Sequence, residues 1–285
     1  MDITWPENLI HSLAERKCAI FIGAGVSATA RSSDGTKIPD WESFIQSAAD
    51  LVSDVCIKNE VDELIKSKDF LLALQAIIDH SDRSEYNRLL NKNFNTQKFE
   101  VSKIHKLIHK LDSRIVITTN FDKLYENYCN STTREEGYKT ITYDNDSLCD
   151  EVRSLSFLII KAHGTIDDVG KMIFTKQQYV NAKYKYPGFY LVLNSIFLTN
   201  LVLFMGCSLM DPDVNLLLEE IKHAGKIKTP NYFFTVAGQS KSRKMDLENS
   251  YGIKTIEYGN SHDNLEPALE NLLSEVERRR SSYIC

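Results

Sequence analysis

Two polar residues, Asn120 and His163, each follow a short apolar run at the point where a buried strand would end. The runs cover residues 115–118 and 157–162, and their apolar, β-branched composition is typical of parallel strands covered on both faces. An asparagine amide carries two donors and an acceptor, so it can hold a sugar hydroxyl and a water together. A histidine titrates near neutral pH and can accept a proton from either group. The pair therefore indicates a nucleotide site in which chemistry takes place.

A segment of small residues follows the first predicted strand, residues 18–22. It consists of Gly23, Ala24 and Gly25, with Ser27 two residues further on. Small residues at a strand-to-helix turn let backbone amides approach a pyrophosphate, and the helix N-terminus adds partial positive charge. The Ser27 hydroxyl can donate to a phosphate or cap the helix. The G-x-G-x-x-G form is incomplete because residue 28 is alanine, so an ordinary tight turn stays open as the alternative.

Other predicted strand ends also carry small or polar residues. Asp122 lies two residues after Asn120 and can cap the next helix, which is the ordinary role of either residue at such a turn. Gly206 and Ser208 end another strand and suit a second nucleotide contact, on the ribose or adenine side. His262 follows the last strand and could contact an adenine, although a plain surface loop explains it equally well. One crevice beyond the carboxyl ends of parallel strands would collect all these residues.

The elements that must position these residues alternate along the chain. Strands are predicted at residues 18–22, 115–118, 140–143, 157–162, 201–205, 232–236 and 254–258, and helices at 5–17, 121–129, 187–198, 212–223 and 264–279. Such alternation implies an α/β fold with a doubly wound parallel sheet. Between about residues 41 and 110 the pattern is helical with no convincing strand, which predicts an inserted smaller helical module. We expect residues 1–285 to form one domain that includes this insertion.

The composition excludes several classes of protein. The net charge of −5 gives no electrostatic reason to expect direct binding to nucleic acid. No apolar stretch approaches the roughly 20 residues that span a bilayer, and the first residues lack the basic and apolar regions of a signal peptide. We therefore expect a cytoplasmic protein with no membrane partner. The six cysteines form no C-x-x-C pair and are expected to be reduced. Cys18 and Cys207 lie in or beside apolar strands and are expected to be buried small side chains.

In the segments that carry the candidate site residues, the chain resembles the SIR2 family, and in particular the SIR2-like NAD-consuming domains of bacterial anti-phage defence proteins. The matching segments, in the family's order, are Gly23-Ala24-Gly25-Val26-Ser27, Ile38-Pro39-Asp40-Trp41, Thr119-Asn120-Phe121-Asp122, His163-Gly164 and Gly206-Cys207-Ser208. The resemblance implies a Rossmann-like sheet with a smaller helical module. It also implies that Asn120 and His163 are catalytic, that residues 23–27 bind phosphate, that Asp40 lies beside nicotinamide, and that Ser208 contacts a ribose.

The chain also departs from the pattern of protein-deacetylating sirtuins. It lacks the two cysteine pairs of their zinc module, so no metal is expected. Glu42 stands where their Ile-Pro-Asp-Phe-Arg signature has arginine, and the interval from Gly25 to Ile38 is longer. These departures fit a zinc-free NADase better than a deacylase, with NAD⁺ as the substrate and no separate cofactor.

Three hypotheses for the function follow. The first is an NAD⁺ hydrolase that yields nicotinamide and ADP-ribose and depletes NAD as an effector of anti-phage defence. The alternatives are a module that senses NAD or ADP-ribose by binding, and an NAD-dependent protein deacylase. The expected partners are NAD⁺, further copies of the chain in a homo-oligomer, and either a C-terminal sensor domain or a separate activator protein.

Overall fold

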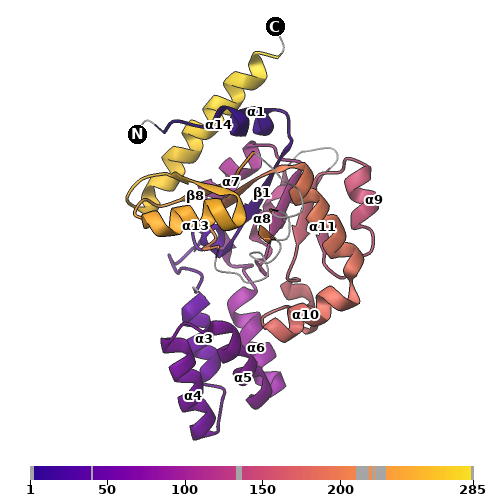
Figure 1. The fold of residues 1–285 in the computed structure, drawn as a ribbon. Helices are drawn as coiled ribbons and strands as arrows, with labels where there is room; N and C mark the ends of the chain where they lie inside the picture. The colour runs from indigo at the N-terminus through magenta and orange to yellow at the C-terminus, as the bar shows by residue number, and fades with distance from the viewer. Residues whose placement is uncertain are drawn as a thin grey trace.

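A parallel sheet forms the centre of the molecule (Figure 1). The computed structural model describes residues 3–39, 41–132, 137–209, 218–219, 222 and 229–283. Within these residues the sheet has seven strands, in the order β5 (Lys139–Thr142), β6 (Leu158–Lys161), β4 (Ile115–Thr118), β1 (Cys18–Ile22), β7 (Leu201–Met205), β8 (Asn231–Thr235) and β9 (Ile253–Glu257). From β6 to β9 this order is that of the doubly wound dinucleotide-binding sheet, with β5 added at one edge. The predicted α/β, Rossmann-like fold is confirmed.

Helices cover both faces of the sheet. Side chains alternate along β1, so Ile20 and Ile22 join one hydrophobic core while Ala19 and Phe21 join the other. The first core includes residues of α1 (Glu7–Ala14), α7 (Lys103–Lys110), α8 (Leu124–Ser131) and α14 (Leu265–Ser281). The second includes residues of α9 (Leu148–Arg153), α10 (Lys176–Lys185), α11 (Pro187–Thr199) and α13 (Lys241–Tyr251). Burial on both faces explains why the strands read as continuous apolar runs.

Four helices form a separate layer at one end of the molecule, and both chain termini lie toward the other end (Figure 1). They are α3 (Trp41–Ala49), α4 (Val55–Lys66), α5 (Phe70–His80) and α6 (Arg83–Phe94). Aspartates at residues 54, 69 and 82 accept hydrogen bonds from the first turns of α4, α5 and α6, so each helix begins at a side-chain cap. The helices enclose a third hydrophobic core, which Phe121 and Phe174 join from the sheet domain.

Several local predictions are wrong or incomplete. The segment from 41 to 110 does contain a strand, β3 (Phe99–Glu100), which pairs with β2 (Arg31–Ser32), a strand that was not predicted either. Two residues are too few to show an alternating pattern, so this pairing depends on tertiary contacts. Helices α9, α10 and α13 were not predicted, and α10 and α13 bury few residues each. Most of the helix predicted at 212–223 lies outside the described residues.

No helix in the part of the chain that the structure describes is both long enough and apolar enough to cross a membrane.

Candidate functional site

The carboxyl ends of four strands are aligned by their register. Ile22 of β1 pairs with Thr118 of β4 on one side and with Met205 of β7 on the other, and Thr118 pairs with Lys161 of β6. The residues that follow these partners therefore leave the sheet at one level. Asn120 and His163 each lie two residues beyond the Thr118–Lys161 pair, on adjacent strands about 4.8 Å apart. The sheet thus brings the two predicted catalytic residues to the same edge.

The turns after β1 and β7 touch through their glycines. The Gly25 amide donates to the carbonyl oxygen of Gly206 (2.7 Å), and the Gly23 amide donates to that of Met205 (3.0 Å). A Cβ atom on Gly206 would lie 2.6 Å from the backbone nitrogen of Val26. Gly206 also has a φ of +64°, which favours glycine. The glycines are therefore required for packing at the point where the strand order reverses, and a phosphate could reach the Gly23 and Gly25 amides only if these bonds broke. Phosphate binding by this turn stays a prediction.

The side-chain amide of Asn120 is held in one orientation. Its Nδ2 donates to the carbonyl oxygen of Gly23 and to the hydroxyl of Ser27, both at 3.0 Å. Its backbone amide donates to Thr118 Oγ1 (3.0 Å). Because a carbonyl oxygen can only accept, the contact with Gly23 identifies the nitrogen of the amide. Both Nδ2 hydrogens are engaged, and within the described residues no protein donor is recorded for Oδ1. The amide of the half-buried Asn120 is therefore fixed in an orientation that leaves Oδ1 as an available acceptor, and its contact with a ligand stays a prediction.

Ser27 and Asp122 complete this network beneath Asn120. The buried Ser27 hydroxyl donates to Asp122 Oδ2 (2.7 Å) while it accepts from Asn120. The other carboxylate oxygen of Asp122 accepts from the backbone amide of Leu124 (3.0 Å), the first residue of α8. The helix thus begins three residues after the predicted residue 121, and its N-cap residue, Lys123, makes no side-chain cap bond. In this arrangement Ser27 and Asp122 position the amide of Asn120, and a direct contact of either with a nucleotide stays a prediction.

His163 lies at a sharp turn that the chain itself packs against. Its carbonyl oxygen accepts from the amide of Ile173 (2.9 Å), and its side chain is half-buried. The next residue, Gly164, has a φ of +89°, and a Cβ atom there would lie 2.6 Å from the carbonyl oxygen of Lys171. Gly164 is thus required because the chain folds back on itself at this point. The turn fixes the backbone of His163 at the sheet edge.

The residue after Asn120 anchors its loop in the helical layer. Phe121 is buried, and its ring lies 4.5 Å from that of Phe174 and 5.2 Å from that of Phe94 in α6. Phe174 in turn stacks near Trp41 at the start of α3 (6.0 Å). Aromatic pairs at these distances stabilise the packing beyond the area they bury. The loop that carries Asn120 is therefore held from both sides, by the sheet and by the helices.

Sequence reasoning missed a buried ion pair below the same loop. Lys161, the last residue of β6, is fully buried, and its ammonium lies 2.8 Å from Glu126 Oε2 of α8. It also donates to the carbonyl oxygen of Asp122 (2.5 Å). Burial raises the pKa of the Glu126 carboxyl, and the ammonium of Lys161 opposes that effect. A lysine inside an otherwise apolar strand was the available signal.

The remaining predicted residues are not all brought together. Ser208 is exposed after β7, at the same sheet edge as Gly206. His262 follows β9, three strands from β1 at the far edge of the sheet, and its Nδ1 lies 2.9 Å from the hydroxyl of Tyr258. Ala24 is exposed in the short helix α2 (Ala24–Ser27), whereas Asp40 lies outside the described residues. The adenine contact of His262 therefore depends on a ligand that extends across several strands.

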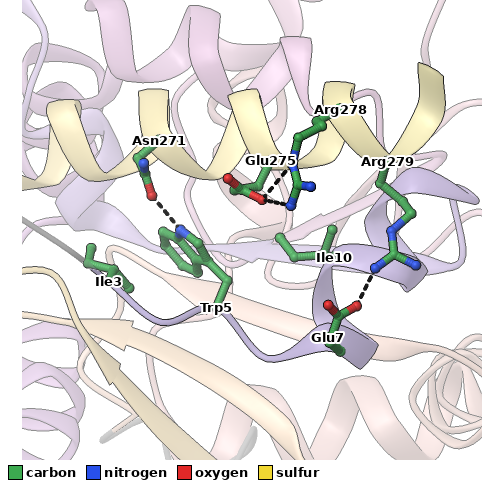
Figure 2. Close-up of a pocket in the computed structure, with 8 residues that line it drawn as sticks. All are labelled: Ile3, Trp5, Glu7, Ile10, Asn271, Glu275, Arg278 and Arg279. Carbon is green, nitrogen blue, oxygen red and sulfur yellow. Dashed lines mark hydrogen bonds and ion pairs between the residues drawn. The ribbon is translucent and has the colours of Figure 1, made fainter. Parts of the chain in front are cut away.

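A pocket of about 250 Å³ lies elsewhere, between the N-terminal segment and α14 (Figure 2). The indole nitrogen of Trp5 donates to Asn271 Oδ1 (2.6 Å) at its wall. Arg278 and Arg279 are paired there with Glu275 and Glu7. None of the predicted site residues lines this pocket, and its arginines are already neutralised. The chemistry of the sheet edge therefore does not extend to it.

The half of the chain that carries Asn120 and His163 matches a family model. The model describes a SIR2-like domain and matches residues 114–256, half of the chain. The chain belongs to the SIR2-like domain family. The match begins at the strand before Asn120 and includes the strands that end at Lys161 and Met205. Three of the four aligned strand ends of this SIR2-like domain, those of β4, β6 and β7, therefore lie within the matched region, and the end of β1 lies outside it.

Curated relatives of this SIR2-like domain carry names that refer to NAD and to defence. The NAD(+) hydrolase ThsA of Cytobacillus dafuensis is 24% identical over 216 residues, 76% of this chain and 40% of the relative. The protein of the same name from Enterococcus faecium is 30% identical over 145 residues, 49% of this chain and 29% of the relative. Defense-associated sirtuin 2 of Bacillus subtilis is 23% identical over 231 residues, 80% of this chain and 21% of the relative. The chain spans less than half the length of each of these relatives.

Proposed function

We propose that this SIR2-like domain hydrolyses NAD⁺ at the bond between nicotinamide and ribose, and that it serves as an NAD-depleting effector of anti-phage defence. The products are nicotinamide and ADP-ribose. The observation that carries the proposal is the fixed amide of Asn120, with both Nδ2 hydrogens engaged within the described residues, at the same sheet edge as His163 on the adjacent strand. The names of the relatives support the choice of substrate and the role in defence.

The chemistry needs little more than such an arrangement. Nicotinamide leaves as a neutral group from a cationic ring, so the protein must stabilise the positive charge that develops on the ribose and present a water. Oδ1 of Asn120 accepts from a ribose hydroxyl or from that water and orients it. His163 accepts the proton that is released as the water adds to the sugar. No metal takes part in this scheme, and NAD⁺ is consumed as the substrate.

The nucleotide lies across the switch point between β1 and β7 in this proposal. Ala24 and the turn at Gly23 and Gly25 face its phosphates, while Gly206 and Ser208 face its second half. The resemblance to the SIR2 family assigns Asp40 to the nicotinamide side. Ser27 and Asp122 act from below through Asn120.

The proposal is tested by incubating the protein with NAD⁺ and resolving the products by chromatography. Several protein concentrations are needed, because we also propose that the active form is a homo-oligomer controlled by a C-terminal sensor domain or a separate activator protein. The expected result is nicotinamide and ADP-ribose in equal amounts. Tight binding of NAD⁺ with no product at any concentration would refute hydrolysis and favour a sensor that only binds the nucleotide.

A further inference from the structure

The buried lysine below the site touches both segments that carry the catalytic pair. Lys161 precedes His163 by two residues on β6, and its ammonium reaches the loop that carries Asn120. There it donates to the carbonyl oxygens of Asp122 (2.5 Å) and Phe121 (3.5 Å). These carbonyls belong to the two residues that directly follow Asn120. One side chain therefore ties the Asn120 loop to the His163 strand.

The lysine is held in place by a single buried carboxylate. Its side chain has no exposed area, and that of Glu126 is 7% exposed, with 2.8 Å between the ammonium nitrogen and Oε2. Burying two charges is costly, so such a pair is weak evidence for a stabilising role, and apolar replacements are often tolerated. A buried ammonium whose remaining donors serve two loop carbonyls suggests a role other than stability. Glu126 compensates the charge, while Lys161 makes the contacts with the loop.

We infer that Lys161 is a positioning residue, which fixes the loop of Asn120 relative to His163 through the carbonyls of Phe121 and Asp122. The inference rests on the proposed function, because it concerns the geometry of the same catalytic pair. Lys161 does not touch the substrate. Its loss would leave the nucleotide-binding surface in place but let Asn120 depart from the geometry that the chemical step requires, and misplacement of a catalytic group by about 1 Å can cost about 100-fold in rate.

The test compares variants that separate stability from positioning. Lys161→Met alone would leave the Glu126 carboxylate buried without a counter-charge, so this variant is expected to unfold. It is therefore not used in the test. The double variant Lys161→Met, Glu126→Met leaves no buried charge and also removes the donors to the loop. Glu126→Gln keeps the volume of the side chain and the bonds from Lys161 to the carbonyls, but it removes the counter-charge of the buried ammonium, so a lower Tm is expected for this variant as well. Lys139→Met, Glu151→Met removes a partly exposed pair from β5 and α9, 2.7 Å apart, and serves as the matched control.

The expected result is a split between kcat and KM. The double variant at 161 and 126 should fold and should lose at least tenfold in kcat for nicotinamide release, with KM for NAD⁺ within about threefold of the unaltered protein. Glu126→Gln and the control pair should keep kcat within about threefold. A double variant with normal kcat would overturn the inference. The inference would also be overturned if the loss of kcat followed the fall in Tm across all variants, including Glu126→Gln.

A second readout does not require activity. Hydrogen–deuterium exchange of the peptide that covers residues 119–126 should be faster in the double variant than in Glu126→Gln or in the control pair. Equal exchange in all of them would overturn the inference even if kcat changed. If the unaltered protein released no nicotinamide while this exchange difference was present, hydrolysis would fail and the positioning role of Lys161 would stand. The two proposals can thus fail separately.

Discussion

Replacing Ser27 by alanine tests whether the amide of Asn120 is fixed by the network beneath it. The Ser27 hydroxyl makes two hydrogen bonds, one donated to the Asp122 carboxylate at 2.7 Å and one accepted from Asn120 Nδ2 at 3.0 Å. A hydrogen bond to a charged group contributes about 1.5–3 kcal/mol and a neutral one about 1 kcal/mol. Both bonds are lost in the variant, while Asp122 keeps its bond from the Leu124 amide, so we expect the free energy of unfolding to fall by about 3 kcal/mol. That loss corresponds to a fall of about 6–12 °C in Tm for a chain of this size.

The same variant should also slow the reaction, by less free energy than it loses in stability. Asn120 keeps its bond to the Gly23 carbonyl in the Ser27→Ala variant, so only one of its two restraints is lost. A loss of about 1 kcal/mol in the restraint reduces the fraction of correctly oriented amide about fivefold. We therefore expect kcat for nicotinamide release to fall about fivefold, measured from initial rates at saturating NAD⁺.

Thr29→Ala is the matched control for this variant. Thr29 lies two residues away, and its hydroxyl donates to the Val26 carbonyl (2.6 Å) and pairs with Ser102 Oγ (2.7 Å), without touching Asn120. The control should lose about 1 kcal/mol of stability and keep its kcat. If Ser27→Ala lost stability but kept full kcat, or if Thr29→Ala lost kcat equally, the proposed restraint on the amide would be wrong.

Two further predictions concern the glycine contact and the response to pH. Gly206→Ala should unfold the protein or remove several kcal/mol of stability, because its Cβ would lie 2.6 Å from Val26 N. Gly137→Ala is the control: Gly137 has a similar φ of +52° but nothing near its Cβ position, so this variant should lose only about 1 kcal/mol. Equal Tm values for the two variants would contradict the packing argument. Burial lowers the pKa of His105 from 6.5 to about 4, and the negative charge of Asp122 opposes part of that decrease. Below pH 6.5 the unfolded chain therefore binds a proton that the folded chain does not. The free energy of unfolding should therefore fall by up to about 3 kcal/mol as the pH drops from about 6.5 to about 4. The urea midpoint of His105→Gln should fall less over this pH range than that of the unaltered protein. Identical pH profiles for the two proteins would refute this prediction.

The ends of several strands could be predicted from the sequence because the residues that mark them are neighbours in the chain. The runs at 115–118 and 201–205 end as the structure has them, since a polar residue or a glycine directly follows each apolar stretch. Parallel pairing then aligns the ends, so the common edge of Asn120 and His163 could be expected before any strand order was known.

The contacts below the site could not be predicted from local patterns. Lys161 and Glu126 are 35 residues apart, and their pairing depends on α8 packing over the end of β6. The glycines at 23 and 206 fit the phosphate-turn pattern, but the structure shows that the two turns fill each other's space. The distance of His262 from the other residues follows from the strand order, which its own segment does not encode.

The central claim is tested most directly by measuring NAD⁺ binding and nicotinamide release side by side for Asn120→Ala and His163→Ala. Asn130→Ala and His80→Ala, with exposed side chains, are the matched controls. Both site variants should fold and bind NAD⁺ but release nicotinamide at least 100-fold more slowly than the unaltered protein, consistent with the loss of a positioned catalytic group, while the controls keep the normal rate. Normal release from both site variants would contradict the account, because the reaction would then not depend on the amide and the imidazole at this sheet edge.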